Sequence, residues 1–112
     1  MGTNSWPIER RRNPRTYLGV PVRVHLAGEP RTLTLELVDV SAGGAYFRTS
    51  GRRPRRGQWV AFGCVVAEYS VCAARGRVLR VDEHGFAIGL ESANSAFQSF
   101  VNDISGPFKM AA

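Results

Sequence analysis

Lysine and cysteine are scarce in this sequence. Lys109 is the one lysine among 15 basic residues, so the positive charge comes almost entirely from arginine. Arginine suits planar, two-pronged recognition of a phosphate or a base edge, and the net charge of +6 therefore predicts an anionic partner. The two cysteines, Cys64 and Cys72, are too few for a structural zinc site. We expect them to be reduced core residues, and the alternative is a cross-strand redox pair.

Long apolar runs are also absent. The longest are far shorter than the roughly 20 residues that a transmembrane helix needs, and the opening residues do not form a secretory signal. We therefore expect a cytoplasmic protein that does not insert into a membrane. The length of 112 residues leaves room for one domain with a modest core, and the 44% hydrophobic content argues against disorder.

Residues that could carry catalysis are few. The stretch DVSAG at 39–43 resembles the nucleophile elbow of hydrolases, but that turn needs glycine where Asp39 stands. His25 alternates with apolar positions and His84 lies in an expected turn, and neither has a second ligand at metal-binding spacing. No glycine-rich stretch stands between a strand and a helix, which excludes the common nucleotide cradles. The sequence therefore predicts no enzyme, no metal site and no bound cofactor.

Period-two alternation of apolar residues is abundant, and this pattern is typical of half-buried strands. The expected strands are 20–26, 33–37, 45–49, 59–67, 71–81 and 86–91. Six short strands with tight connections close most readily into a small antiparallel barrel. The loop before the fourth strand carries a second arginine cluster at positions 52, 53, 55 and 56. We expect these arginines to be solvated, and the alternative is a partner-docking patch.

The last stretch changes to a helical period. Apolar residues recur at i, i+3, i+4 and i+7 from Phe97 to Ile104, Asn94 or Ser95 is the expected N-cap, and Gly106 begins the stop signal. A helix of about ten residues is marginal alone, so it must dock on an apolar surface such as an opening of the barrel. Five aromatic residues fall at core-facing periods: Trp59, Phe62, Phe86, Phe97 and Phe100.

These patterns predict an all-β domain with one helix, in three parts. Residues 1–16 form a flexible arginine-rich leader, residues 17–106 form the barrel and its C-terminal helix, and residues 107–112 form a tail. The leader contains four arginines within six positions, whose like charges repel one another. This repulsion predicts that the leader stays extended until it holds an anion.

The first of two motifs that could bind a ligand is RxxxR, with Arg11 and Arg15 at its two ends. Pro14 biases Asn13 away from the helical region, so the two arginines could stand up to about 13 Å apart in an extended chain. They could then reach separate parts of one ligand. A guanidinium can donate two parallel hydrogen bonds to guanine O6 and N7, stack on a purine, or fork onto a phosphate.

The second motif is DxSxxG, formed by Asp39, Ser41 and Gly44. A carboxylate at position 39 accepts hydrogen bonds, and guanine offers N1–H and N2–H on its other edge. Ser41 can donate or accept, while Gly43 and Gly44 let backbone amides approach a ligand without a Cβ in the way. The alternative is an ordinary turn in which the glycines adopt positive φ. The two motifs together predict a site for a guanine that carries phosphate.

The order of these motifs, with DxSxxG at the end of a strand, resembles the PilZ domain, the bacterial receptor module for cyclic di-GMP. The resemblance extends to the late strand GFAIGLE and to the terminal helix. It implies a six-stranded antiparallel β-barrel with a C-terminal α-helix, and a ligand held between the leader and the outer surface of the barrel. The site residues that it implies are Arg11, Arg15, Asp39, Ser41 and Gly44, with Arg10, Arg12 and Gly43 as weaker candidates.

The resemblance implies a stand-alone cyclic di-GMP receptor that is not an enzyme. We expect it to signal by ligand-induced ordering of its leader and to regulate a separate, unidentified protein. Two alternatives stay open: a small basic barrel that binds nucleic acid, and a PilZ-fold adaptor that no longer binds the nucleotide. Single-strand binders stack bases on aromatic side chains along exposed strands, whereas the exposed positions expected here carry mainly Arg, Thr and Glu. Nucleic acid is therefore the less fitting partner.

Overall fold

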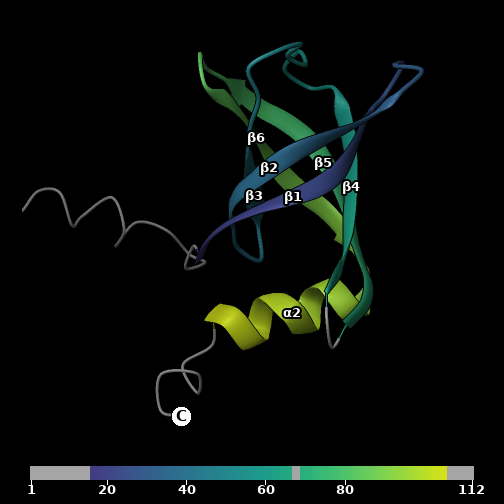
Figure 1. The fold of residues 1–112 in the computed structure, drawn as a ribbon, viewed down its shortest axis with the longest axis vertical. Coiled ribbons are helices and arrows are strands. Elements are labelled where there is room, and N and C mark those ends of the chain that lie inside the picture. Colours follow the sequence, from purple (N-terminus) through teal and green to yellow (C-terminus); the bar gives the residue numbers. More distant parts are fainter. Residues whose placement is uncertain (1–15, 67–68, 106–112) are drawn as a thin grey trace, which may run out of the picture.

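The computed structural model describes residues 16–66 and 69–105, which form one closed barrel and one helix (Figure 1). The strands are β1 (Thr16–Leu26), β2 (Thr32–Val40), β3 (Gly44–Arg48), β4 (Trp59–Val66), β5 (Tyr69–Val81) and β6 (Gly85–Ala93). Their order around the barrel is β1-β2-β3-β6-β5-β4, all neighbours are antiparallel, and pairing of β1 with β4 closes the ring. The expected six-stranded antiparallel barrel with one helix is confirmed.

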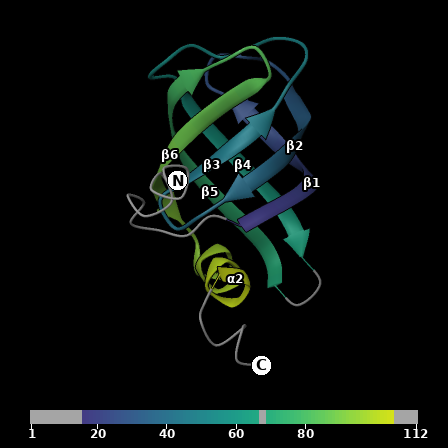
Figure 2. The ribbon, with the colours of Figure 1, turned by 90° about the vertical axis from the view of Figure 1, so that its left-hand side faces the viewer.

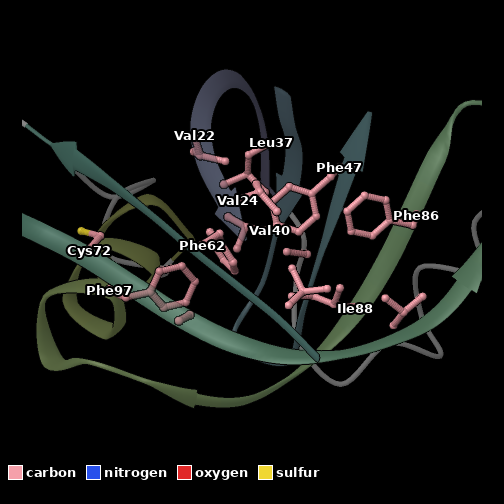
Figure 3. Close-up of a cluster of buried hydrophobic side chains, with 14 of the residues drawn as sticks. Val22, Val24, Leu37, Val40, Phe47, Phe62, Cys72, Phe86, Ile88 and Phe97 are labelled. Carbon is pink, nitrogen blue, oxygen red and sulfur yellow. The ribbon is translucent and has the colours of Figure 1, made fainter. Parts of the chain in front are cut away.

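The barrel core follows from the alternation of apolar residues. Val22, Val24 and Leu26 of β1 point inward and are almost completely buried. An aromatic cluster fills the interior around Phe47, which stacks on Phe86 at 5.2 Å and meets the edge of Phe62 at 4.9 Å between ring centroids (Figure 3). Aromatic contacts of this kind stabilise a core beyond the area that they bury.

The helix α2 (Ser95–Ser105) lies across one end of the barrel in both ribbon views (Figures 1 and 2). Asn94 is its N-cap, because the side-chain Oδ1 accepts a hydrogen bond from Phe97 N at 2.9 Å. Phe97 and Val101 join the buried core, and the ring of Phe97 meets that of Phe62 at 5.8 Å. The amphipathic helix therefore closes the barrel, as its period predicts.

Trp59 is a correction to the expected core. Val60 and Phe62 take the inward positions of β4, so Trp59 falls on the outer face and is partly exposed. Two arginines of β5 lie over its ring there. The other four expected aromatic residues are confirmed, with Phe62, Phe86 and Phe97 buried and Phe100 packed at the edge of the core.

Cys64 and Cys72 face one another across β4 and β5, and both thiols are free. Burial raises the pKa of both thiols, and the neighbouring Cys64 raises that of Cys72 further. A raised pKa lowers the fraction of reactive thiolate at neutral pH. The expectation of reduced core cysteines therefore agrees with the structure.

The arginine cluster of the β3–β4 loop lies at the end of the barrel away from α2 (Figure 1). Arg52 pairs with Glu29 of the β1–β2 turn, and Arg53 donates to the carbonyls of Asp82 and Glu83 in the β5–β6 turn. Both side chains are exposed, as the prediction of solvation expects, and they also tie three loops together. Arg55 and Arg56 are exposed, as expected.

Candidate ligand-binding site

The DxSxxG motif forms the tight turn between β2 and β3. Ser41 N donates to Gly44 O at 2.9 Å, which closes the turn, and Gly43 N donates to Ser41 Oγ at 3.3 Å. Gly43 O in turn accepts from Leu90 N of β6 at 2.9 Å. The motif is therefore held from inside by its own serine and from the side by a third strand.

Asp39 owes its position to a β-bulge. Leu37 and Val40 are both core residues although they are three positions apart, which strict alternation does not allow. The register of β2 against β3 shifts between positions 37 and 39, and this extra residue lets Asp39 leave the inner face. Only 8% of Asp39 and 5% of Ser41 is exposed, so both polar residues are buried although they lie outside the apolar core.

Two tyrosines are the nearest cross-strand neighbours of Asp39. Tyr17 of β1 stands opposite Asp39 on one side, and Tyr46 of β3 stands opposite on the other. Tyr17 is 76% exposed. An aromatic ring beside a carboxylate can stack on a purine whose N–H edge donates hydrogen bonds to that carboxylate. Sequence reasoning missed both tyrosines as site residues, and the signal was their position two residues after Arg15 and Gly44.

Gly44 is required by close approach of strands. A Cβ at this position would lie 2.9 Å from Ile88 O. Gly44 does not have a positive φ, so the alternative in which the glycines adopt positive φ is wrong for this residue. Its partner in the register is Gly89 of β6. Leu79, 59% exposed, lies over Gly89, because a Cβ there would be 3.3 Å from Leu79 Cδ1. The surface beside the motif is therefore smooth and partly apolar.

A hydrogen-bonded cluster borders this surface. Tyr46 Oη donates to Asp82 Oδ1 at 2.8 Å, Arg80 donates to Asp82 Oδ2 at 3.3 Å, and the Arg80 guanidinium lies 5.6 Å from the Tyr46 ring centroid. The Tyr46 hydrogen bond is the main cause that lowers the pKa of Asp82, followed by the backbone N–H of His84. Burial and then Asp82 raise the pKa of Tyr46. At neutral pH the aspartate is ionised and the tyrosine is a donor that is fixed in place.

The structure brings together the described candidates Asp39, Ser41, Gly43 and Gly44 at one turn. Arg10, Arg11, Arg12 and Arg15 lie outside the described residues. β1 begins at Thr16, which pairs with Val40, so the first described residue lies beside the turn. Arg15 directly precedes Thr16 in the sequence.

Within residues 16–66 and 69–105, no three His, Cys, Asp or Glu side chains gather as a metal site. His25 bonds to Glu29 O at 3.0 Å, and His84 lies 3.4 Å from Glu83. In the same described part, no helix combines the length and apolar content needed to cross a bilayer.

Comparisons with known proteins agree with this geometry. The family model described as PilZ domain matches residues 9–105. Among solved structures, the chain is similar to the Bacillus subtilis inhibitor of motility (MotI/DgrA), with a TM-score of 0.72 and 14% sequence identity. The match covers 91% of this chain and 52% of the other, so the chain spans about half of that protein's length. No curated protein matches the sequence.

The described residues form a closed antiparallel barrel that is capped by a helix and carries a serine-held turn beside the start of its first strand. The family model matches residues 9–105, which is most of the chain, so the match identifies the family. The chain belongs to the PilZ domain family, a family of cyclic di-GMP receptors.

Proposed function

We propose that this chain is a non-enzymatic receptor for cyclic di-GMP that regulates a separate protein. One observation carries the proposal: the family match spans both motifs, and Asp39, Ser41 and Gly44 share one turn beside the first residue of β1. RxxxR and DxSxxG are intact in the sequence. Intact motifs argue against an adaptor that has lost its ligand.

Each motif has a chemical role in the proposal. Arg11 and Arg15 hold guanine and phosphate through paired N–H donors, and Asp39 accepts from the N1–H and N2–H edge of guanine. Arg10 and Arg12 are further candidates for phosphate contacts. Tyr17 and Tyr46 flank Asp39, and the exposed ring of Tyr17 offers a face for the base. The ligand would therefore lie against the outer surface of β1, β2 and β3.

The proposed signal is an ordering of the leader. Two phosphates offset the repulsion among the arginines, and two guanines join the leader to the barrel. Binding then creates a surface of leader, ligand and barrel that a partner can read. Ordering the leader opposes binding, so we expect affinity in the micromolar to submicromolar range, about −8 kcal/mol or somewhat stronger.

Calorimetric titration of the purified chain tests the ligand assignment. Cyclic di-GMP is expected to bind more tightly than GMP or cyclic di-AMP, because adenine presents a donor where guanine O6 accepts. Equal affinity for cyclic di-AMP would contradict the guanine-edge argument. The rival function, nucleic-acid binding, is supported by the sequence pI of about 10.4. It requires affinity for long DNA or RNA that falls steeply as salt rises, so competition at several salt concentrations separates the two functions.

A further inference from the structure

The outer face of β1, β4 and β5 carries a second set of basic side chains. The register places His25, Ala61 and Arg75 in one row across these strands, and Trp59 and Arg77 in the next. All of these side chains point outward, because Val60 and Phe62 occupy the inward positions of β4. The DxSxxG turn lies between β2 and β3, so this face uses other strands.

Trp59 holds two guanidiniums in fixed positions. The guanidinium carbon of Arg77 lies 4.3 Å from the centre of the Trp59 ring system, and that of Arg75 lies 5.2 Å from it. A guanidinium stacked on a ring loses little further freedom when its N–H edge binds a carboxylate. The pair is therefore preorganised for an acidic ligand.

Two hollows adjoin the stacked arginines. One has a volume of about 390 Å³ and is lined by His25, Trp59, Ala61 and Arg75, among others. The second, about 350 Å³, is lined by Ala61, Ala73, Arg75 and Asn94, among others. The two hollows adjoin, because both are lined by Ala61 and Arg75, and small residues form their floor; we call the two hollows together the groove. Such a groove has room for apolar side chains between charged contacts.

This face carries more positive than negative charge. On the groove face, Arg75 donates to the neutral hydroxyl of Ser92, and Arg77 forms an ion pair with Glu91 at 3.5 Å. Arg23, in the row beyond His25, adds a further exposed positive charge. The groove therefore combines excess positive charge with an apolar floor.

We propose that this Trp59 face, consisting of Arg23, His25, Trp59, Ala61, Arg75 and Arg77, docks an acidic segment of the partner protein with an apolar side chain in the groove. The proposal rests on the proposed function, since it locates the partner that the receptor regulates. A nucleic acid fits less well, because the Trp59 ring is already stacked by arginine and is therefore a poor platform for a base.

The test uses the full chain with Trp6→Phe, so that fluorescence reports Trp59 alone. The probe is a short synthetic peptide of Glu and Asp with a central Leu, titrated with cyclic di-GMP present at saturation. Arg75→Glu with Arg77→Glu is expected to weaken peptide binding by at least about tenfold. Arg55→Glu with Arg56→Glu makes the same charge change on an exposed loop and is expected to leave binding within about twofold. Equal losses in the two variants would overturn the proposal.

Two further variants keep the test decisive if the charge reversal disturbs folding. Arg75→Gln with Arg77→Gln removes charge while it keeps length, and Ala61→Gln fills the floor without any change of charge. Both are expected to weaken the peptide, and the Leu→Ser form of the peptide is expected to bind more weakly to the parent. Unchanged binding to the Ala61→Gln variant would overturn the groove. A short oligothymidylate could bind more tightly than the peptide and lose that binding in the Arg75 and Arg77 variants. That outcome would assign the face to nucleic acid instead.

Cyclic di-GMP titration of the same proteins separates the two proposals. The Arg75 and Arg77 variants are expected to bind the nucleotide like the parent, since neither residue belongs to the two motifs. Failure of cyclic di-GMP to bind the parent would refute the receptor assignment. The peptide titration would then be repeated without nucleotide, and peptide binding that depends on Arg75 and Arg77 would still support the docking face. Nucleotide binding without face-specific peptide binding would refute only the docking face.

Discussion

Asp39 and Ser41 are buried polar residues of the described barrel, and both belong to the candidate site. Buried polar groups are costly unless they are hydrogen-bonded, so such residues shape the turn in addition to any contact with ligand. Arg15 differs, because it precedes the first residue of β1. The two motifs should therefore respond differently to mutation.

Arg15→Ala is expected to abolish cyclic di-GMP binding and to leave the free energy of unfolding within about 0.5 kcal/mol of the parent. Asp39→Ala is expected to lose binding and also to lower stability, by about 1–3 kcal/mol, since it empties a buried polar position. Calorimetry and thermal melting of both variants provide the comparison. Parent-like binding by Arg15→Ala would show that the role implied for this arginine is wrong.

Gly44→Ala tests the close approach of β3 and β6. The new Cβ would meet Ile88 O at 2.9 Å, so the strands must separate, and we expect a loss of about 1–3 kcal/mol in urea unfolding. Gly51→Ala is the matched control, because nothing lies within 4 Å of a Cβ there and its φ is not positive. If both variants unfold at the same urea concentration, close approach does not explain Gly44.

At the scale of elements, Asn94 joins α2 to β5. Its Oδ1 accepts from Phe97 N and from Ala73 N at 3.2 Å, and its Nδ2 donates to Val71 O at 2.8 Å. Asn94→Ala is expected to cost about 1–3 kcal/mol, from the lost cap and the lost strand contacts. Asn94→Asp keeps the acceptor but not the donor, and should fall between the two. Asn102→Ala, on an exposed position of the same helix, is the control in thermal melts.

The β5–β6 turn should weaken in acid. Asp82 accepts from Tyr46, His84 N and Gly85 N, and its pKa is lowered in the fold. A lowered folded pKa contributes stability above the unfolded pKa, near 3.9, and that stability is lost as pH falls through the folded value. Melting temperature against pH is therefore expected to fall less steeply below about pH 4 in Asp82→Asn than in the parent. Identical acid limbs would contradict this role.

The sequence predicts the elements better than their outer surfaces. Period-two alternation locates all six strands within a few residues, because inward positions must be apolar. The alternation predicts Trp59 inside because both inward and outward positions of β4 carry apolar residues, and only the closed barrel decides which of them face the core. The bulge between Val78 and Arg80 leaves both Leu79 and Arg80 on the outer face and returns Val81 to the core, which period-two alternation does not predict.

The candidate site shows the same limit. Asp39, Ser41 and Gly44 follow from a local motif, and the structure places them at one turn. Tyr17 and Tyr46 become neighbours of Asp39 only through strand register, which two bulges shift. The groove beside Trp59 likewise depends on which residues of β1, β4 and β5 face one another. Long-range pairing, and not composition, decides these surfaces.

At the scale of the whole molecule, the proposed switch joins a charged leader to a rigid barrel. The barrel has a continuous ring of strand pairs and a packed aromatic core, so it is a poor candidate for a large change on binding. The leader has arginine at positions 10, 11, 12 and 15, and these like charges repel one another. In the proposed switch, we therefore expect a ligand with two phosphates to order the leader and to leave the barrel unchanged.

Amide hydrogen exchange over residues 5–17, with and without cyclic di-GMP, is the direct measurement of this switch. We expect fast exchange in the free protein and strong protection in the complex, since bound phosphates offset the repulsion and fix the leader against the Asp39–Gly44 turn. Strands β4 and β5 should exchange equally slowly in both states and serve as the internal control. A leader protected in the free protein, or unprotected in the complex, would remove ordering as the mechanism while receptor binding itself could still stand.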